Sequence, residues 1–273
     1  MIYVDLELAR RLERTEATSN ARFVEARARL HPESGATWTE VAGAYALFDG
    51  PDSPLTQTFG LGLFGPVGKA ELEEIEAFFA ARQAPVLHEV SPLADPELLA
   101  LLPARGYQPI EYTSVLYLPL SEADLPAAPA ADPALRTRRI EPHEAELWAR
   151  TSAAGWSSES AELSDFVFGF GRISAQSAGT SPFLAELEGE AIAAGGLFVH
   201  DGTALLAGAS TVPAARRRGG QQALLAARLR YAAGQGATLA MMGAWPGSQS
   251  QRNAEKHGFR IAYTRIKWAQ PGG

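Results

Sequence analysis

The sequence predicts an α/β (α+β) protein of two tandem units, each with a mixed, mostly antiparallel sheet flanked by helices. Two observations lead to this fold class. First, an Ala/Pro-rich segment at residues 121–133 divides the chain near its middle, and prolines among alanines favour an extended linker over a packed element. Second, each half contains a helix, a strand, a short helix and a closing strand in the same order.

The closing strands resemble each other most. Gly106-Tyr107 and Gly258-Phe259 each follow a short expected helix, and one insertion brings the later Tyr112-Thr113 and Tyr263-Thr264 into register. The preceding elements that correspond are helices at 71–83 and 221–236 and strands at 86–90 and 238–242. We interpret this as an internal duplication. It predicts a first domain at residues 1–120, a linker at 121–133 and a second domain at 134–273.

Local signals define the elements of the second half. Pro142 is a good first-turn residue for a helix. Asp201-Gly202 between apolar runs indicates a hairpin. Leu225, Leu229 and Ala232 recur at helical spacing and predict one apolar helix face. The expected order is a strand at 135–140, a helix opened by Pro142, a helix at 161–174, strands at 183–188, 191–199 and 204–212, a helix at 221–236, a strand at 238–242, a helix starting at Ser248 and a last strand after Gly258.

Composition excludes several kinds of chemistry. The 273 residues are 46% hydrophobic, enough for a sizeable core, and carry a formal charge of -7, which argues against a general nucleic-acid binder. There is no cysteine, so disulfides, thiolate catalysis and cysteine metal sites are excluded. No apolar run has membrane-spanning length and the N-terminus lacks the pattern of a signal peptide. We therefore expect a soluble, cytoplasmic protein.

A basic, glycine-bearing loop follows the strand at 204–212. The strand stops at Thr211-Val212-Pro213, and Arg216-Arg217-Arg218-Gly219-Gly220-Gln221-Gln222 leads into the next helix. A helix start offers unpaired N–H groups and the positive end of its dipole, glycines allow close backbone approach, and arginines add charge. The arrangement predicts a pyrophosphate site. The alternative for each arginine is a solvated turn residue.

Placed between this strand and this helix, the loop resembles the GNAT acyltransferase superfamily. The family pattern is Gln or Arg, two residues, Gly, one residue, then Gly or Ala, and residues 216–221 match it except that Gln221 replaces the final small residue. The resemblance covers Leu135 to about Trp268 and implies acetyl-CoA as acyl donor. The residues that it implies for cofactor binding are Thr211, Val212, Arg216, Arg217, Arg218, Gly219, Gly220, Gln221, Gln222, Ser248 and Asn253.

The resemblance leaves the catalytic groups unassigned. Many family members place a tyrosine four residues before the closing glycine, where this chain has Ala254. Weak catalytic candidates are Asn253, Tyr263 and Glu186. Glu188 and His200 are further candidate bases, although both lie near turns, and Ser248 is equally well explained as a helix cap. Trp156-Ser157-Ser158 falls where such folds often build the acceptor pocket, and a buried anchoring tryptophan is the alternative.

The first half resembles a degenerate copy. Its corresponding segment, residues 60–69, holds a single cation, and the part from Gly65 to Lys69 is too loose for a Walker A loop. We expect this half to line the acceptor site or to hold a homodimer. The expected function is an acetyl-CoA-dependent N-acyltransferase acting through the second half on an amine of a small molecule or peptide, without metal, nucleic acid or membrane. The alternatives are a non-catalytic acyl-CoA-binding or sensing protein with the same fold, and an interaction protein.

Overall fold

The computed structural model describes residues 3–121 and 134–270 and divides into two compact units. Unit 1 comprises Met1–Tyr117 and Gly243–Gly273, and unit 2 comprises Leu118–Met242. The C-terminal segment thus packs with the N-terminal half, so the compact units differ from the domain ranges expected from the duplication. The linker expected at residues 121–133 lies, apart from Ser121, outside the described residues.

Unit 1 holds the strand order β1-β2-β3-β4-β11-β5, in which, among the described residues, only β3 and β4 run parallel. Its strands are β1 (Thr37–Val41), β2 (Ala44–Phe48), β3 (Gln57–Phe59), β4 (Leu87–Val90), β5 (Gln108–Pro119, of which the last two residues belong to unit 2) and β11 (Arg260–Ala269). Its helices are α1 (Leu6–Leu30), α2 (Lys69–Ala80), α3 (Pro96–Ala104) and α7 (Gln249–Lys256), with a 3-10 turn at Pro32–Ser34.

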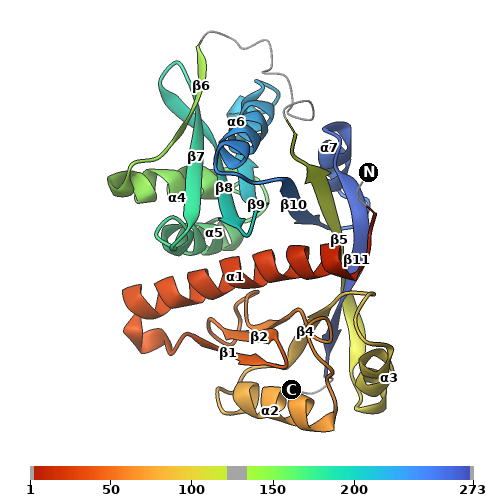
Figure 1. Ribbon diagram of the computed structural model, residues 1–273. Coiled ribbons are helices and arrows are strands. Elements are labelled where there is room, and N and C mark those ends of the chain that lie inside the picture. The colour runs from red at the N-terminus through yellow and green to blue at the C-terminus, as the bar shows by residue number, and fades with distance from the viewer. Residues whose placement is uncertain (1–2, 122–133, 271–273) are drawn as a thin grey trace. The chain divides into compact units, whose positions relative to one another are not determined.

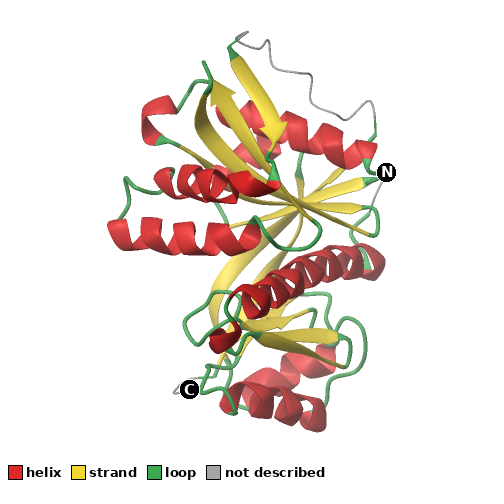
Figure 2. Ribbon diagram, turned by 90° about the vertical axis from the view of Figure 1, so that its left-hand side faces the viewer, coloured by secondary structure: helices red, strands yellow, loops and turns green. Residues whose placement is uncertain are grey.

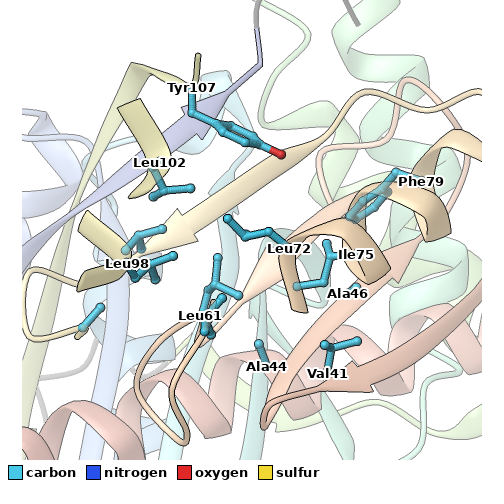
Figure 3. Close-up of a cluster of buried hydrophobic side chains, with 13 residues drawn as sticks. Val41, Ala44, Ala46, Leu61, Leu72, Ile75, Phe79, Leu98, Leu102 and Tyr107 are labelled. Carbon is cyan, nitrogen blue, oxygen red and sulfur yellow. The ribbon is translucent and has the colours of Figure 1, made fainter. Parts of the chain in front are cut away.

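Helices cover both faces of this sheet (Figure 1). α1 packs through Ala17, Ala21 and Val24 against Leu47 and Phe59 of the strands. On the other face, α2 and α3 build an apolar cluster with β1, β2 and β4 (Figure 3). The members of this cluster include Leu72, Ile75, Phe79, Leu98, Leu102 and Tyr107, all buried. Burial on both sides explains why even the short strands of this unit are stable.

The two closing strands start alike, as the sequence predicts. α3 and α7 are each followed, after one cap residue, by a glycine in the left-handed region, Gly106 with φ 86° and Gly258 with φ 88°. In both places the N–H of the following aromatic residue donates to a carbonyl five residues earlier, Tyr107 to Leu102 and Phe259 to Ala254. This is the Schellman cap that glycine favours because it carries no Cβ. β5 and β11 lie side by side as antiparallel neighbours.

Unit 2 holds the strand order β10-β9-β8-β7-β6 and is antiparallel except between β9 and β10. Its strands are β6 (Leu135–Arg139), β7 (Thr180–Leu187), β8 (Glu190–His200), β9 (Thr203–Thr211) and β10 (Leu239–Ala244, of which the last two residues belong to unit 1). Its helices are α4 (Ala145–Ala154), α5 (Ala161–Ser174) and α6 (Gly220–Gly234), with 3-10 turns at Pro142–Glu144 and Pro213–Ala215.

The sheet of unit 2 also lies between helices (Figure 2). Trp148 of α4 packs on Leu184 and Ala194, and its indole donates to the Phe183 carbonyl. The rings of Phe183 and Tyr231 of α6 lie 5.5 Å apart. Since Phe183 and Leu184 are adjacent on a strand, they point to opposite faces. α4 and α6 therefore cover opposite faces.

The predicted α/β (α+β) fold class is confirmed, because the described strands of each unit form mixed, mostly antiparallel ladders flanked by helices. The helix expected at 161–174 is found at those residues as α5, and the other expected elements are found with small shifts of their ends. The elements expected from the sequence do not include α1 or β1–β3. Among the described residues, no helix is both long and apolar enough to cross a membrane.

Candidate functional site

Strand β9 of unit 2 carries a bulge near its end. Ala194 of β8 pairs with Ser210, whereas Gly196 pairs with Ala207. Between these two pairs, β9 has one residue more than β8. Gly208, within this extra stretch, has a left-handed backbone conformation with φ 60°. A bulge bends a strand and redirects its backbone groups. Ala207, Gly208 and Ala209 are exposed here.

The bulged segment also borders a gap in the sheet ladder. β10 pairs with β9 in parallel over Thr203–Leu205 only. From Leu206 to Thr211, the edge of β9 that would face β10 has no strand partner among the described residues. A strand edge with free amide and carbonyl groups can pair with an extended ligand, as in β-augmentation. The end of β9 therefore offers a strip of backbone for an amide-containing chain.

The loop beyond β9 leaves several amides free. Within the described part of the chain, the backbone N–H groups of residues 217–222 make no hydrogen bond, and Ala223 is the first residue of the helix to donate, to the Gly219 carbonyl. The cap residue Gly219 has no side chain to accept from these groups. Free N–H groups and the positive end of the α6 dipole lie together here. This is the local geometry that binds phosphate.

The residues of the loop are suited to close approach by an anion. Gly219 has φ 84°, a region that side-chain-bearing residues avoid. A Cβ on Gly220 would lie 3.2 Å from Ile192 Cδ1, so this glycine lets α6 start directly on the sheet. Arg217 has φ 66° although it is not glycine, a strained conformation of the kind that gathers at functional sites. Arg217 and Arg218 are exposed cations beside the free amides.

Four residues of the predicted cofactor set, Arg216, Gln221, Thr211 and Val212, already have hydrogen-bond partners within the protein. Arg216 Nη2 donates to the Gly155 carbonyl at 3.0 Å and to Ser158 Oγ at 3.2 Å. The loop is thereby tied to the segment between α4 and α5. Gln221 Nε2 donates to Thr211 Oγ1 at 2.9 Å, so the residue that departs from the family pattern bridges the strand end and the helix start. Val212 is held by its N–H to the Ile192 carbonyl.

Glu186 lies in an ion cluster at the other edge of unit 2. Arg138 Nη2 contacts Glu186 Oε1 at 2.7 Å, and Arg138 Nη1 contacts Glu144 Oε2 at 2.6 Å. The hydrogen bond from Arg138 lowers the pKa of Glu144 to about 2. β6 and β7, which carry Arg138 and Glu186, are the last two strands in the order, away from β9. These contacts favour a structural role for Glu186, as they join β6, β7 and the turn before α4.

Ser248 and Asn253 lie in unit 1, Ser248 at the N-cap of α7 and Asn253 within the helix. Ser248 Oγ accepts from the Gln251 N–H at 3.2 Å, so this serine caps the helix as the sequence predicts. Asn253 is exposed, and its Oδ1 accepts from Gln249 Nε2 at 2.7 Å. Ala254, at the position of the family tyrosine, is buried. A cofactor role for Ser248 and Asn253 remains a prediction.

Tyr263 is part of a buried ion cluster in unit 1. Its hydroxyl donates to Glu13 Oε1 at 3.0 Å, and burial raises its pKa well above the usual value. Arg265 contacts Glu13, Glu16 and Glu89 at 3.1, 2.8 and 2.8 Å. The hydroxyl already has a carboxylate partner, which favours a structural role for Tyr263. Among the described residues, no group of three or more His, Asp or Glu could hold a metal ion.

Sequence reasoning missed the bulge in β9. A signal was present, because an isolated glycine inside a strand pattern often marks a bulge, and Gly208 stands in the apolar run that follows the hairpin. It also missed the buried cation of α6, Arg228, which is 3% exposed. That residue had no signal in the sequence, since an arginine on a helix is normally read as solvated.

Comparison with known proteins places this geometry in a fold class. No family model and no curated protein matches the chain. Among solved structures, a GCN5-related N-acetyltransferase from Kribbella flavida is similar over 93% of this chain and 96% of its own, with 23% identity and a TM-score of 0.61. A tandem GNAT protein from the clavulanic acid biosynthesis pathway is similar over 82% of this chain and 72% of its own, with 15% identity and a TM-score of 0.57.

A third structure, a GCN5-related N-acetyltransferase from Sphaerobacter thermophilus, is similar over 80% of this chain and 73% of its own, with 14% identity and a TM-score of 0.52. The chain therefore has the fold of the GNAT N-acetyltransferases, as the loop at residues 216–221 predicts. The similarity extends over most of the chain, and one of the similar structures is itself a tandem protein.

Proposed function

We propose that the protein is an acetyl-CoA-dependent N-acyltransferase that holds its acyl donor on unit 2. One observation carries the proposal: the free amides at the start of α6 adjoin the unpaired, bulged end of β9. The first feature suits a pyrophosphate and the second suits the extended, amide-bearing arm of a coenzyme. The likeness to N-acetyltransferase structures supports the same reading.

In this proposal, the loop before α6 binds the pyrophosphate of the coenzyme and the end of β9 binds its extended arm. The N–H groups of residues 217–222 would donate to the pyrophosphate, and Arg217 and Arg218 would add charge-assisted hydrogen bonds. The backbone of β9 from Leu206 to Thr211 would pair with the arm and bring the acyl carbonyl to the bulge. Acetyl-CoA supplies an activated thioester. Backbone N–H groups at the bulge would polarise its carbonyl without a metal.

The acceptor in this proposal is an amine of a small molecule or peptide. The amine nitrogen must be neutral to attack the thioester carbonyl. It becomes positively charged as the C–N bond forms and then loses a proton, while the thiolate takes up a proton as the C–S bond breaks. No residue is assigned to either transfer. Arg216 ties the loop at residues 216–222 to Gly155 and Ser158. This contact supports Trp156-Ser157-Ser158, between α4 and α5, as the candidate acceptor-binding segment.

One observation favours a second function. Ala254 presents a buried methyl group where many family members have a tyrosine acid. A non-catalytic acyl-CoA-binding protein would keep the donor site and need no such acid. The two functions differ in a single measurement, because only the enzyme releases free coenzyme A in the presence of an amine.

The proposal is tested by binding and by turnover. Saturating acetyl-CoA should raise the melting temperature by about 5 °C, because a ligand that binds only the folded state stabilises it. Thiol release with a panel of amines then reports transfer, and the protein contributes no background because it has no cysteine. A shift without thiol release would favour the binding protein, and no shift would overturn both.

Gly219→Val locates the site. Gly219 has φ 84°, so a β-branched residue must distort the backbone that carries the free amides, at a strain of about 1–2 kcal/mol. We expect loss of the acetyl-CoA shift. Gly236→Val is the matched control, since Gly236 follows the other end of α6 with φ 82° and open space around its Cβ position. A full shift in the Gly219 variant would show that the pyrophosphate binds elsewhere.

A further inference from the structure

A buried cation without a counter-ion lies under the sheet of unit 2. Arg228 of α6 is 3% exposed, and burial lowers its pKa to about 10. Its Nη1 donates to the Gly196 carbonyl at 3.0 Å and its Nε to the Leu224 carbonyl at 3.3 Å. No carboxylate pairs with it in the described ranges, residues 3–121 and 134–270.

Such a residue is costly for a helix that needs only an apolar face. Leu224 and Leu229, its neighbours on α6, are fully buried. A charge taken out of water without an opposite charge destabilises the fold, and a leucine or methionine would fill the same space without that cost. The stability of the sheet therefore does not explain an arginine at this position.

The guanidinium group lies against the strand position that faces the bulge. A Cβ on Gly195 would approach Arg228 Cζ and Nη1 to 3.0 Å each, so any side chain there would displace the group. In the ladder, Ala194 pairs with Ser210 and Gly196 with Ala207. Gly195 thus stands opposite the extra residue of β9, and the hydrogen bond from Arg228 holds the carbonyl of the next residue.

We propose that Arg228 is a positioning residue that fixes the bulge of β9 through the Gly196 carbonyl, with its positive charge directly behind the exposed backbone of that bulge. The inference rests on the proposed function, in which this backbone polarises the acyl carbonyl. A fixed positive charge in a low-dielectric interior stabilises negative charge that develops nearby. The neighbouring strand lies about 4.8 Å from β8, so the charge acts over a short distance.

The kinetic test compares Arg228→Met with Arg228→Lys. Methionine fills the space without charge, so the acetyl-CoA thermal shift and KM should stay within about twofold of wild type while kcat falls at least about tenfold. Lysine keeps the charge and should recover part of kcat. Gly195→Ala keeps the arginine but displaces its guanidinium, and should lower kcat in the same way. Arg230→Met, an exposed position on the same helix, is the control and should leave kcat unchanged.

A second readout does not need turnover. Amide hydrogen exchange at residues 207–209 should be faster in Arg228→Met than in wild type, with the exchange of unit 1 unchanged, because the bulge loses the group that holds it. Unchanged exchange, or unchanged kcat in Arg228→Met, overturns the positioning role. If wild type shows neither an acetyl-CoA shift nor thiol release, the proposed function fails, and the exchange experiment still decides whether Arg228 sets the bulge.

Discussion

Single side chains determine how the loop before α6 is built. The sequence presents three consecutive arginines as equivalent, but only Arg216 turns back to bond Gly155 and Ser158. Arg217 and Arg218 stay exposed next to the free amides. Sequence reasoning could state that some of the three were structural, but the choice among them depends on which carbonyls lie within reach in the folded chain.

His88 of β4 is an example of a polar residue that the fold leaves without partners. It is fully buried, and neither ring nitrogen has a hydrogen-bond partner among the described residues. Thr58 and Trp268 are its register neighbours on β3 and β11, and each also has a buried polar atom without a partner. Burial lowers the pKa of His88 to about 3.

This pKa predicts a loss of stability in acid. The histidine of the unfolded chain binds a proton below its ordinary pKa of 6.5, and the folded one does not until about 3. The contribution of His88 to stability is therefore fully present well above pH 6.5 and is lost as the pH drops, by about 2 kcal/mol between pH 7.5 and 5. In urea unfolding, the free energy of unfolding of His88→Leu should fall less between pH 7.5 and 5 than that of wild type, by the same amount of about 2 kcal/mol, the contribution of His88. The exposed His31→Gln should keep the wild-type difference, and an unchanged slope in His88→Leu would refute the assignment.

The helix α1 is joined to the strands of unit 1 by buried ions. Glu13 and Glu16 of α1 meet Arg265 of β11, and Arg265 and Lys267 meet Glu89 of β4. Glu111 of β5 completes the cluster through Lys267. Four carboxylates thus share two cations. Burial raises the pKa of Glu13 to about 7.

For Glu13 the sign of the pH effect is opposite to that of His88. The unfolded carboxyl loses its proton near 4.5 and the folded one near 7, so the fold loses stability as pH rises through this range. Glu13→Gln keeps an oxygen to accept from Tyr263 and does not ionise. Its stability relative to wild type should be greater at pH 8 than at pH 5 by roughly 2 kcal/mol in urea unfolding. Glu7→Gln, exposed on the same helix, should show no such change. If the stability of Glu13→Gln relative to wild type were the same at pH 5 and pH 8, the raised pKa of Glu13 would be contradicted.

At the scale of the whole chain, its two ends build one sheet. β11 lies between β4 and β5 and pairs with both, although some 140 residues separate it from β5 in sequence. The duplicated motifs and the Ala/Pro-rich linker predict two domains that meet near the middle of the chain. Both signals are local properties of the sequence. Strand pairing is not local, and the contacts assign Gly243–Gly273 to unit 1.

This arrangement predicts that residues 1–120 do not fold alone. Without β11, β4 loses one neighbour and the part of β5 in unit 1 loses its partner strand, and Glu13 and Glu89 lose Arg265. We expect a poorly dispersed NMR spectrum and no cooperative unfolding for this fragment. The same fragment joined through a Gly/Ser linker to residues 243–273 should regain both. Cooperative unfolding of residues 1–120 by themselves would show that β11 is dispensable.

The sequence by itself determined the elements of unit 2, the two glycine-capped helix ends and the basic loop at residues 216–222, because helical periodicity, turn chemistry and backbone freedom at glycine act over a few residues. The tertiary structure decided the rest. It placed β11 in unit 1, gave Arg216 and Tyr263 structural partners, bulged β9 at Gly208 and buried Arg228 beneath it. Each of these depends on contacts between residues distant in sequence, and such contacts form only when the whole sheet closes.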